Sequence, residues 1–281
     1  MTPLIAVAVL TAALTHASWN AIAHGIKDQL VAFTLVCGGG ALCAAALAPF
    51  ASLPHRGAWP FLIASVVIHL GYQYLLMRSF QLGEFGQVYP VARGIAPPTV
   101  TLLAAVFVGE WPGAWQTAGV LVASAGLCGV ALWGMRGKRP NWPALAAAVG
   151  TGMTIAGYTV VDGVGVRASG TSLGYISWLL MIEGMFVPVL AVTARRGELL
   201  AQLRPVAARG LLGGALSITA YGLVLWAQTR ADLAPVAALR ETSIIVGAAI
   251  GSVFFKERFG RPRIVAAVVV VGGIGLMLHS G

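Results

Sequence analysis

Long apolar stretches separated by short polar ones dominate the chain. No Asp, Glu, Lys or Arg occurs in residues 1–26, 29–55, 57–77, 111–135 or 140–161. A helix of about 20 apolar residues crosses the roughly 30 Å hydrocarbon core of a bilayer, and each of these runs is long enough. The pattern predicts an all-α integral membrane protein that crosses the bilayer several times.

Charges, prolines and glycines divide the chain into ten apolar segments, which we number one to ten. They cover residues 3–23, 30–50, 59–80, 88–109, 114–135, 142–163, 172–194, 207–229, 233–255 and 264–280. The connections between them are short, so the sequence predicts ten transmembrane helices and no soluble domain.

Composition narrows the class of protein further. Of the 281 residues, 58% are hydrophobic and 10% are charged, and the mean hydropathy is +0.85. Soluble proteins carry about 25% charged residues, so a soluble or disordered chain is excluded. The net charge is +9. Most of the basic residues that produce it stand in the short connections, where they act as topology signals. We therefore expect the lipid bilayer as a partner and no nucleic acid.

Two of the ten segments contain charges that lipid would not tolerate. Segment four contains Pro90, Arg93, Pro97 and Pro98, and segment nine contains Arg240 and Glu241. A charge near the bilayer centre costs at least ~2.5 kcal/mol. Both segments are therefore expected to face protein or water.

The two halves of the chain align with one another. A shift of 147 residues places Arg93 on Arg240, Glu110 on Glu257, Gln81 on Gln228, Tyr74 on Tyr221 and Gly126 on Gly273. A shift of 139 residues places Thr15 on Thr154 and Trp19 on Tyr158. The alternative is chance similarity between two sequences rich in Ala, Gly and Val.

A repeat of five spans inserts its two copies with opposite orientation, because five is odd. The sequence thus predicts two inverted five-helix repeats, residues 1–139 and 140–281, in one membrane domain. Transporters of this plan build a central site near the midplane from interrupted helices of both halves.

The chain resembles the EamA-type family of the drug/metabolite transporter (DMT) superfamily. The family's signature at the end of the fourth span stands here as Val108-Gly109-Glu110-Trp111 and Phe255-Lys256-Glu257-Arg258, and a Gly-rich fifth span follows each copy. Trp111 replaces the usual Arg, and Lys256 the usual Gly. The resemblance implies a multi-pass protein of the bacterial inner membrane, similar to exporters of amino acids and metabolites.

Polar and aromatic residues inside the segments are the candidates for lining the cavity. In segment one, Thr11, Thr15 and Trp19 share a helical face, and segment six repeats the spacing. The predicted substrate-binding and cavity residues are His16, Trp19, Asn20, His69, Tyr72, Gln73, Arg78, Tyr89, Arg93, Tyr158, Asp162, Trp178, Glu183, Tyr221, Arg240 and Glu241.

Each candidate also has a structural interpretation. Tryptophans can belong to the interfacial belt, histidines can be satisfied core residues, and Asp162 and Arg78 can snorkel to a span end. Arg93 and Arg240 could bind a substrate carboxylate through paired N–H donors. Alternatively, Arg240 is a fixed strut neutralised by Glu241 or by Glu183.

A gate is predicted in segments four and nine. Pro90, Pro97 and Pro98 remove backbone donors and permit bending, while Gly247 and Gly251 form a small-residue surface suited to close helix contact. Static kinks without motion are the alternative.

No enzyme motif fits the chain. Residues 170–174 match Gly-x-Ser-x-Gly, but they bridge two spans and lack the strand that a nucleophile elbow requires. There is no phosphate-binding loop, and the three cysteines lack metal or redox spacing. We expect no enzymatic activity, no cofactor and no metal site.

The predicted function is a secondary transporter that exports amino acids or related metabolites by alternating access. A monomer suffices, because ten spans can enclose a cavity. Efflux of cationic or lipophilic drugs is the alternative, followed by a membrane scaffold or an intramembrane enzyme. Orientation is open: 12 Lys and Arg in the odd-numbered connections against three in the even-numbered ones place both termini outside, whereas the resemblance implies cytoplasmic termini.

Overall fold

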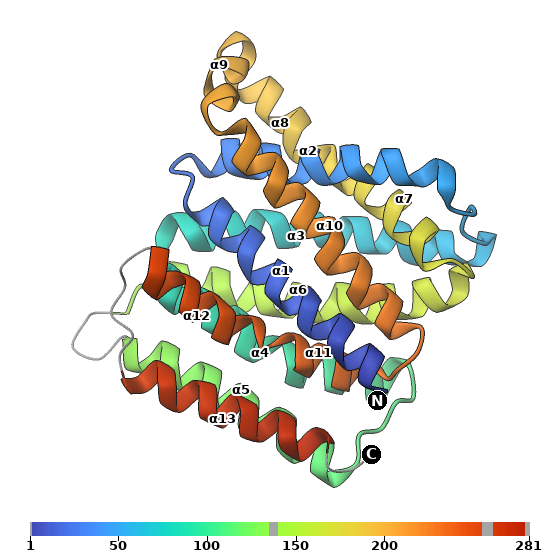
Figure 1. The fold of residues 1–281 in the computed structure, drawn as a ribbon, viewed down its shortest axis with the longest axis vertical. Helices are drawn as coiled ribbons and strands as arrows, with labels where there is room; N and C mark the ends of the chain where they lie inside the picture. The colour runs from blue at the N-terminus through green and yellow to red at the C-terminus, as the bar shows by residue number, and fades with distance from the viewer. Residues whose placement is uncertain (1, 135–139, 255–260, 279–281) are drawn as a thin grey trace.

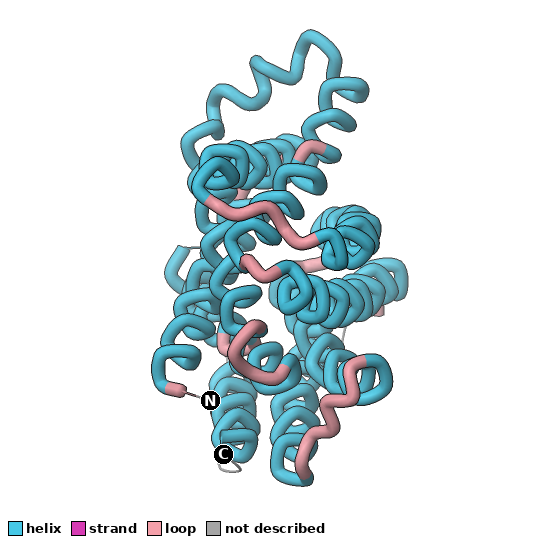
Figure 2. The backbone as a smooth tube through the Cα atoms, turned by 90° about the vertical axis from the view of Figure 1, so that its right-hand side faces the viewer, coloured by secondary structure: helices cyan, strands magenta, loops and turns pink. Residues whose placement is uncertain are grey.

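The computed structural model describes residues 2–134, 140–254 and 261–278, and within these ranges the regular structure is helical (Figure 2). The α-helices are α1 (Pro3–His24), α2 (Gln29–Leu47), α3 (Trp59–Leu82), α4 (Phe85–Phe107), α5 (Ala114–Gly134), α6 (Trp142–Ser169), α7 (Ser172–Gly184), α8 (Phe186–Arg195), α9 (Leu199–Leu203), α10 (Ala207–Gln228), α11 (Leu233–Arg240), α12 (Ser243–Phe254) and α13 (Arg261–Leu278). Short 3-10 turns lie at Ala48–Phe50, Arg56–Ala58, Arg196–Glu198 and Arg204–Val206.

Most predicted segments correspond to one helix each, with two exceptions. Segment nine is divided into α11 and α12 around Glu241, at the charged residues that were expected to face protein or water. Segment seven is divided into α7 and α8 at Met185, which the sequence did not predict. Segment four, in contrast, forms the continuous helix α4 although three prolines lie inside it.

Six helical stretches in the described part of the chain are long and apolar enough to cross a membrane. They are Pro3–His24, Gln29–Phe50, Arg56–Leu82, Gln87–Phe107, Trp142–Ser169 and Ser172–Gln228. The last comprises α7 to α10 and therefore covers more than one predicted segment. A shorter apolar stretch, Val265–Met277, lies in α13. The protein is thus an all-helical protein with several apolar helices, as expected for a multi-pass membrane protein.

Local sequence fixes where several helices begin and end. The carboxylate of Asp28 accepts hydrogen bonds from the backbone N–H groups of Leu30 and Val31 at the start of α2. Asn141 and Thr171 cap α6 and α7 in the same way. Gly170 ends α6 with φ of 71°, a left-handed conformation that glycine adopts without strain.

Helices of the first half pack in pairs against helices of the second half. Helix α3 packs along α6, α1 packs along α10, and α5 packs along α13. In Figure 1 the pair α5 and α13 forms the lower end of the molecule, and α2 and α8 lie at the upper end. Helices α1 and α6 run in opposite directions, as do α5 and α13.

Glycines allow the closest of these contacts. A Cβ atom on Gly273 of α13 would lie 2.6 Å from the carbonyl oxygen of Gly119 in α5, and one on Gly119 would overlap the carbonyl of Gly273. Two turns further along α5, a Cβ atom on Gly126 would lie 2.8 Å from the side chain of Val269. The two backbones approach one another because neither glycine carries a side chain.

Candidate functional site

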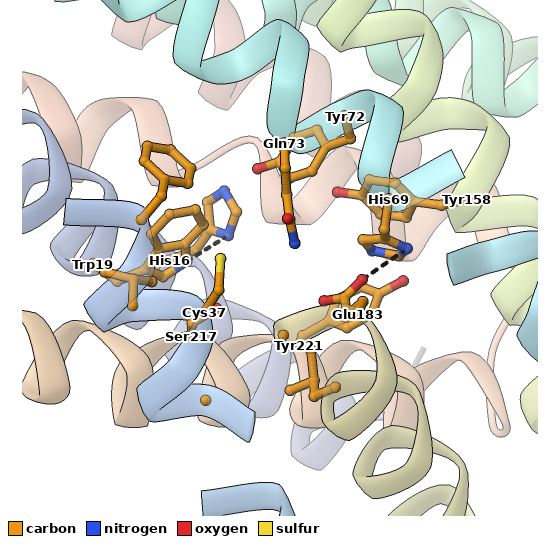
Figure 3. A pocket seen from close by; sticks show the side chains of 15 residues that line it. His16, Trp19, Cys37, His69, Tyr72, Gln73, Tyr158, Glu183, Ser217 and Tyr221 are labelled. Carbon is orange, nitrogen blue, oxygen red and sulfur yellow. Dashed lines mark hydrogen bonds and ion pairs between the residues drawn. The ribbon is translucent and has the colours of Figure 1, made fainter. Parts of the chain in front are cut away.

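A narrow cavity lies in the interior, among α1, α2, α3, α6, α7 and α10 (Figure 3). Its lining residues are His16, Trp19, Phe33, Val36, Cys37, Gly40, His69, Tyr72, Gln73, Tyr158, Leu180, Glu183, Gly184, Ser217 and Tyr221. The cavity measures about 60 Å³, whereas pockets that hold small organic ligands measure about 300–1,000 Å³. In this conformation it admits a few water molecules.

Aromatic rings surround the part of the cavity around His69. The imidazole of His69 stacks on Tyr158 with ring centroids 4.0 Å apart, and Tyr221 lies edge-on at 5.5 Å. Tyr72 contacts both His69 and Tyr158 edge-on. This cluster presents π faces and hydroxyl groups to the cavity, which suits a ligand with an apolar body or a cationic group.

The carboxylate of Glu183 faces the same cluster. Its Oε2 atom lies 3.4 Å from Nδ1 of His69, as the dashed line in Figure 3 shows. Glu183 is the penultimate residue of α7, directly before the break at Met185. Apart from it, no Asp, Glu, Lys or Arg is among the described residues that line the cavity. The lining therefore carries one acidic group among aromatic rings.

His16 and Trp19 occupy the other side of the cavity (Figure 3). Both come from α1, and the indole Nε1 of Trp19 donates to Nδ1 of His16 at 3.3 Å. Their three-residue spacing places them on one face of the helix. The acceptor role of Nδ1 leaves Nε2 of His16 as the nitrogen that carries the proton in the neutral ring.

Asp162 lies behind this lining and is fully buried. The hydroxyl of Tyr175 donates to its Oδ1 at 2.8 Å, and the hydroxyl of Tyr221 donates to its Oδ2. Tyr221 therefore joins Asp162 to the cavity wall. The snorkelling interpretation of Asp162 is wrong for this conformation, because the side chain points into the bundle and is bound there.

Arg93 is held at the break between α11 and α12. Its Nε lies 3.0 Å from Oε2 of Glu241, and its Nη2 donates to the carbonyl of Arg240 and to the hydroxyl of Ser243, both at 3.1 Å. The break frees backbone carbonyls at the negative end of α11, where a cation is favoured. Arg93 thus fixes α4 against the interrupted helix.

Arg240 aligns with Arg93 in the predicted repeat, but its surroundings differ. Its side chain is buried, and its Nε and Nη2 atoms have no hydrogen-bond partner among the described residues. It also makes no ion pair with Glu241 or Glu183 there, so the strut predicted for it is formed by Arg93 instead. Its charge lies within electrostatic range of Glu241 and of His16, His69 and Tyr158 in the cavity wall. A buried guanidinium with free donors needs an anionic or polar partner.

The predicted site residues divide into two groups in the structure. Those that line the cavity are His16, Trp19, His69, Tyr72, Gln73, Tyr158, Glu183 and Tyr221. Those that do not line it are Asn20, Arg78, Tyr89, Arg93, Asp162, Trp178, Arg240 and Glu241. Arg78 is bound to Gln81 near the end of α3, Trp178 packs edge-on against Trp59, and Tyr89 contacts Ser243.

Helix α2 contributes lining residues that the sequence did not single out. Phe33, Val36, Cys37 and Gly40 form one wall. Segment two contains no charge and few polar residues, so no signal distinguished its cavity face from its other faces. These α2 residues reach the cavity because α2 packs closely against the end of α7. A Cβ atom on Gly184 would lie 2.6 Å from the carbonyl oxygen of Cys37.

The residues predicted to form a gate lie in two different environments. Pro90 and Pro97 are buried within α4, whereas Pro98 is half-buried. A Cβ atom built on Gly247 would lie 3.7 Å from the ring of Tyr89, which is an ordinary van der Waals distance. Gly251 lies in α12, at a position whose surroundings are not described, and Glu257 lies outside the described residues.

Glu110 joins the two halves at the end of the molecule where α1 begins and α13 ends. Its Oε1 lies 2.5 Å from Nη1 of Arg167, and its Oε2 accepts from the backbone N–H of Leu233 at 2.8 Å. Arg167 in turn donates to the carbonyls of Gln228 and Ala231. A carboxylate at the first helical residue of α11 also complements the positive end of the helix dipole.

A comparison with protein families finds a match in the second half of the chain. Residues 142–279 match the EamA-like transporter family. The second half of the chain is therefore similar to an EamA-like transporter domain of the DMT superfamily, and this similarity indicates a membrane transporter of the DMT type. No curated protein matches the sequence significantly.

Solved structures share the fold, and 27 chains match significantly. One of them, titled "Crystal structure of protein", superposes with a TM-score of 0.70 over 98% of this chain and 96% of its own length, at 17% sequence identity. At that identity the likeness concerns the fold alone.

Proposed function

We propose that the protein is a secondary transporter that exports amino acids or related small metabolites across the bacterial inner membrane by alternating access. The observation that carries this proposal is the aromatic cavity at the interrupted helix α7/α8, with Glu183 in its wall. Arg240, at the end of α11, lies outside the lining, and its Nε and Nη2 atoms have no hydrogen-bond partner among the described residues. Transporters commonly place their substrate sites at such helix breaks.

The helix packing supports an inverted repeat of ten spans. In the proposed repeat, α1 corresponds to α6 and α3 corresponds to α10. The contact between α3 and α6 therefore has its counterpart in the contact between α10 and α1. The contact of Gly119 with Gly273 corresponds to that of Gly126 with the segment containing Ala266 and Val269. The opposite directions of α5 and α13 agree with this arrangement (Figure 1). Two related modules of opposite orientation are the usual basis of alternating access.

The charges favour a zwitterionic substrate. Its ammonium group would contact Glu183 and the faces of Tyr158 and Tyr221, and its carboxylate would receive the free Nε and Nη2 donors of Arg240. Arg93 is less suited to this role, because it already pairs with Glu241 and its Nη2 binds the break, although its Nη1 also has no hydrogen-bond partner among the described residues. A cavity of about 60 Å³ is too small for an amino acid. Binding of an amino acid therefore requires the helices around the cavity to separate. A carrier that alternates between two access states makes such a movement.

Counterflow in proteoliposomes tests the function. Vesicles containing the purified full chain are loaded with one unlabelled amino acid from a panel, and uptake of the same labelled amino acid is measured. We expect transient accumulation with at least one apolar or aromatic amino acid. Counterflow absent for the entire panel, with the protein folded and inserted, would contradict the proposal.

Efflux of cationic amines is the second candidate, and one observation favours it. Glu183 is the single acidic group among the described lining residues, and the arginines lie behind the wall. Amines that lack a carboxylate should then compete with labelled amino acid as well as the amino acids themselves do. If only carboxylate-bearing compounds compete, the amine alternative is wrong and Arg240 is the discriminating group.

A further inference from the structure

A second recess lies where α6 ends, α7 begins and α10 ends, on the right-hand side of Figure 1. It measures about 520 Å³, within the range of pockets that hold small ligands. Its polar lining residues are Arg167 in the last turn of α6, Thr171 and Ser172 at the start of α7, and Thr229 and Arg230 directly after α10. No acidic residue is among the described residues that line it. The recess thus combines two arginines with three hydroxyl groups and shares no residue with the lining of the central cavity.

The guanidinium of Arg230 is held in place with one edge unused. Its Nη1 donates to the carbonyl of Trp226 at 3.2 Å and to the hydroxyl oxygen of Thr229 at 2.8 Å. Its Cζ lies 4.3 Å from the centre of the Trp226 ring, which is a cation–π distance. Neither Nε nor Nη2 makes a hydrogen bond or an ion pair with the residues that the structure describes. Two adjacent N–H donors on a fixed guanidinium fit two oxygens of one phosphate group.

The charges around the recess leave Arg230 without a counter-ion. Arg167 pairs with Glu110, and it also donates to two backbone carbonyls at and just after the end of α10. It therefore fixes the segment from which Arg230 projects, while its own charge is balanced. Asp232 is exposed and forms no ion pair within the described ranges. A ligand group with a single negative charge complements the remaining arginine.

The start of α7 supplies further donors to the recess. The hydroxyl of Thr171 accepts a hydrogen bond from the N–H of Gly174 and keeps its own hydrogen to donate. The side chain of Ser172 makes no hydrogen bond with the described residues. The N–H of Ser172 lies in the first turn of a 13-residue helix, where it has no acceptor within the helix. These neutral donors can bind the phosphate oxygens that Arg230 does not.

Tryptophans place the recess at the level of the lipid headgroups. Trp59 begins α3, Trp178 lies in the second turn of α7, and Trp226 lies in the last turn of α10. All three are half-buried, and the rings of Trp59 and Trp178 meet edge-on at 5.5 Å. Half-buried tryptophans at span ends are typical of the membrane interface, where lipid phosphates lie. Below the recess, Leu173 and Ile182 are 40% and 43% exposed on α7 and offer an apolar path for an acyl chain.

We propose that this recess binds the phosphate group of an anionic phospholipid from the surrounding bilayer, and that Arg230 is the residue that holds it. A lipid phosphodiester carries one negative charge, which matches the one unpaired arginine. Phosphatidylglycerol adds no positive charge, whereas the ammonium group of a zwitterionic lipid brings a cation beside Arg167 and Arg230. The bound lipid connects α6, α7 and α10. The site is independent of the proposed transport function.

Native mass spectrometry of the purified full chain tests the site. Phosphatidylglycerol or phosphatidylcholine with the same acyl chains is added to the protein in a neutral detergent, and bound lipid is counted per chain. We expect phosphatidylglycerol to bind about 10-fold more tightly or better, because its phosphate receives charge-assisted hydrogen bonds without an opposing cation. Arg230→Gln should lose this preference. Arg230→Lys keeps the charge but not the two-donor edge, so it should bind less tightly than the wild type.

Arg204→Gln is the matched control. Arg204 is an exposed arginine at the opposite end of α10, so its loss should leave lipid binding unchanged. Circular dichroism and thermal unfolding without added lipid verify that each variant is folded. If Arg230→Gln does not fold, Ser172→Ala replaces it, because this variant keeps the contacts of Arg230 and the cap of Thr171. Loss of its hydroxyl donor should weaken phosphatidylglycerol binding by about 2- to 10-fold.

Inorganic phosphate distinguishes a lipid headgroup from a soluble phosphate. Added in large excess, it should leave phosphatidylglycerol bound, because the acyl chains contribute to lipid binding alone. Equal binding of the two lipids by the wild type would overturn the proposal. Unchanged phosphatidylglycerol binding in the folded Arg230 and Ser172 variants, or displacement of the lipid by inorganic phosphate, would overturn it as well.

Discussion

Arg93 and Glu241 form a fully buried ion pair, with Nε of Arg93 3.0 Å from Oε2 of Glu241 and side chains that are each 1% exposed. The pair joins α4 of the first half to the break between α11 and α12 of the second half. Arg93 also binds the carbonyl of Arg240 and the hydroxyl of Ser243. The two helices that the sequence marked as interrupted are thus fixed to one another at their polar positions.

Breaking this pair should destabilise the protein. Arg93→Met leaves Glu241 buried without a cation, and we expect a loss of about 3–5 kcal/mol in the free energy of unfolding. The double variant Arg93→Met/Glu241→Gln removes both charges and should recover part of that loss. Thermal unfolding in detergent checks both variants. Additive losses in the double variant would show that the two side chains do not interact.

Arg240 should behave in the opposite way. Its Nε and Nη2 atoms are buried without a hydrogen-bond partner in the described part of the chain, so we expect Arg240→Met to leave the unfolding free energy unchanged or to raise it. Amino-acid affinity should fall roughly 10- to 100-fold, because a charge-assisted hydrogen bond contributes about 1.5–3 kcal/mol. Calorimetric titration checks the affinity, with the decarboxylated amine of the same amino acid as the control. Equal losses for both ligands would argue against a carboxylate at Arg240.

The contact between α5 and α13 should not tolerate a side chain at Gly119. A methyl group there would overlap the carbonyl oxygen of Gly273, and we expect Gly119→Ala to cost about 1–3 kcal/mol of stability. Gly129→Ala, on the same helix with nothing within 4 Å of the added Cβ, is the matched control. It should be neutral or slightly stabilising, since Ala favours helices over Gly. Thermal unfolding of both variants decides whether the close contact exists.

Glu110 should restrain the start of α11. Glu110→Gln removes the ion pair with Arg167 and weakens the bond to the N–H of Leu233. Because Arg167 is 32% exposed, the stability loss should be at most about 1 kcal/mol, but hydrogen exchange at residues 233–236 should become faster. Asp232→Asn, whose side chain makes no capping bond, should leave the exchange rate unchanged. Equal rates in all three proteins would show that Glu110 does not hold α11.

The sequence predicted the helices well because each depends on local composition. Charge-free runs give helices in lipid regardless of their neighbours, since backbone polar groups must be satisfied within the helix. In segment nine, Arg240 and Glu241 predicted contact with protein or water, and the structure places the helix break at these residues. The break after Glu183 was missed, because a single acidic residue in an apolar run does not show whether the helix continues. Three prolines in segment four predicted an interruption that tertiary packing overrides, as α4 is continuous.

The sequence by itself determined the all-helical membrane class and the polar residues that must avoid lipid. The relation of Arg93 to Arg240 through an internal repeat stays a prediction. Only the tertiary structure decided which of the polar residues share the cavity. It placed Glu183 beside His69, gave Glu241 to Arg93 rather than to Arg240, and brought apolar residues of α2 into the wall. The physical reason is that membrane insertion depends on each segment's own hydropathy, whereas a side chain's partner depends on how closely the glycine-containing faces of different helices pack.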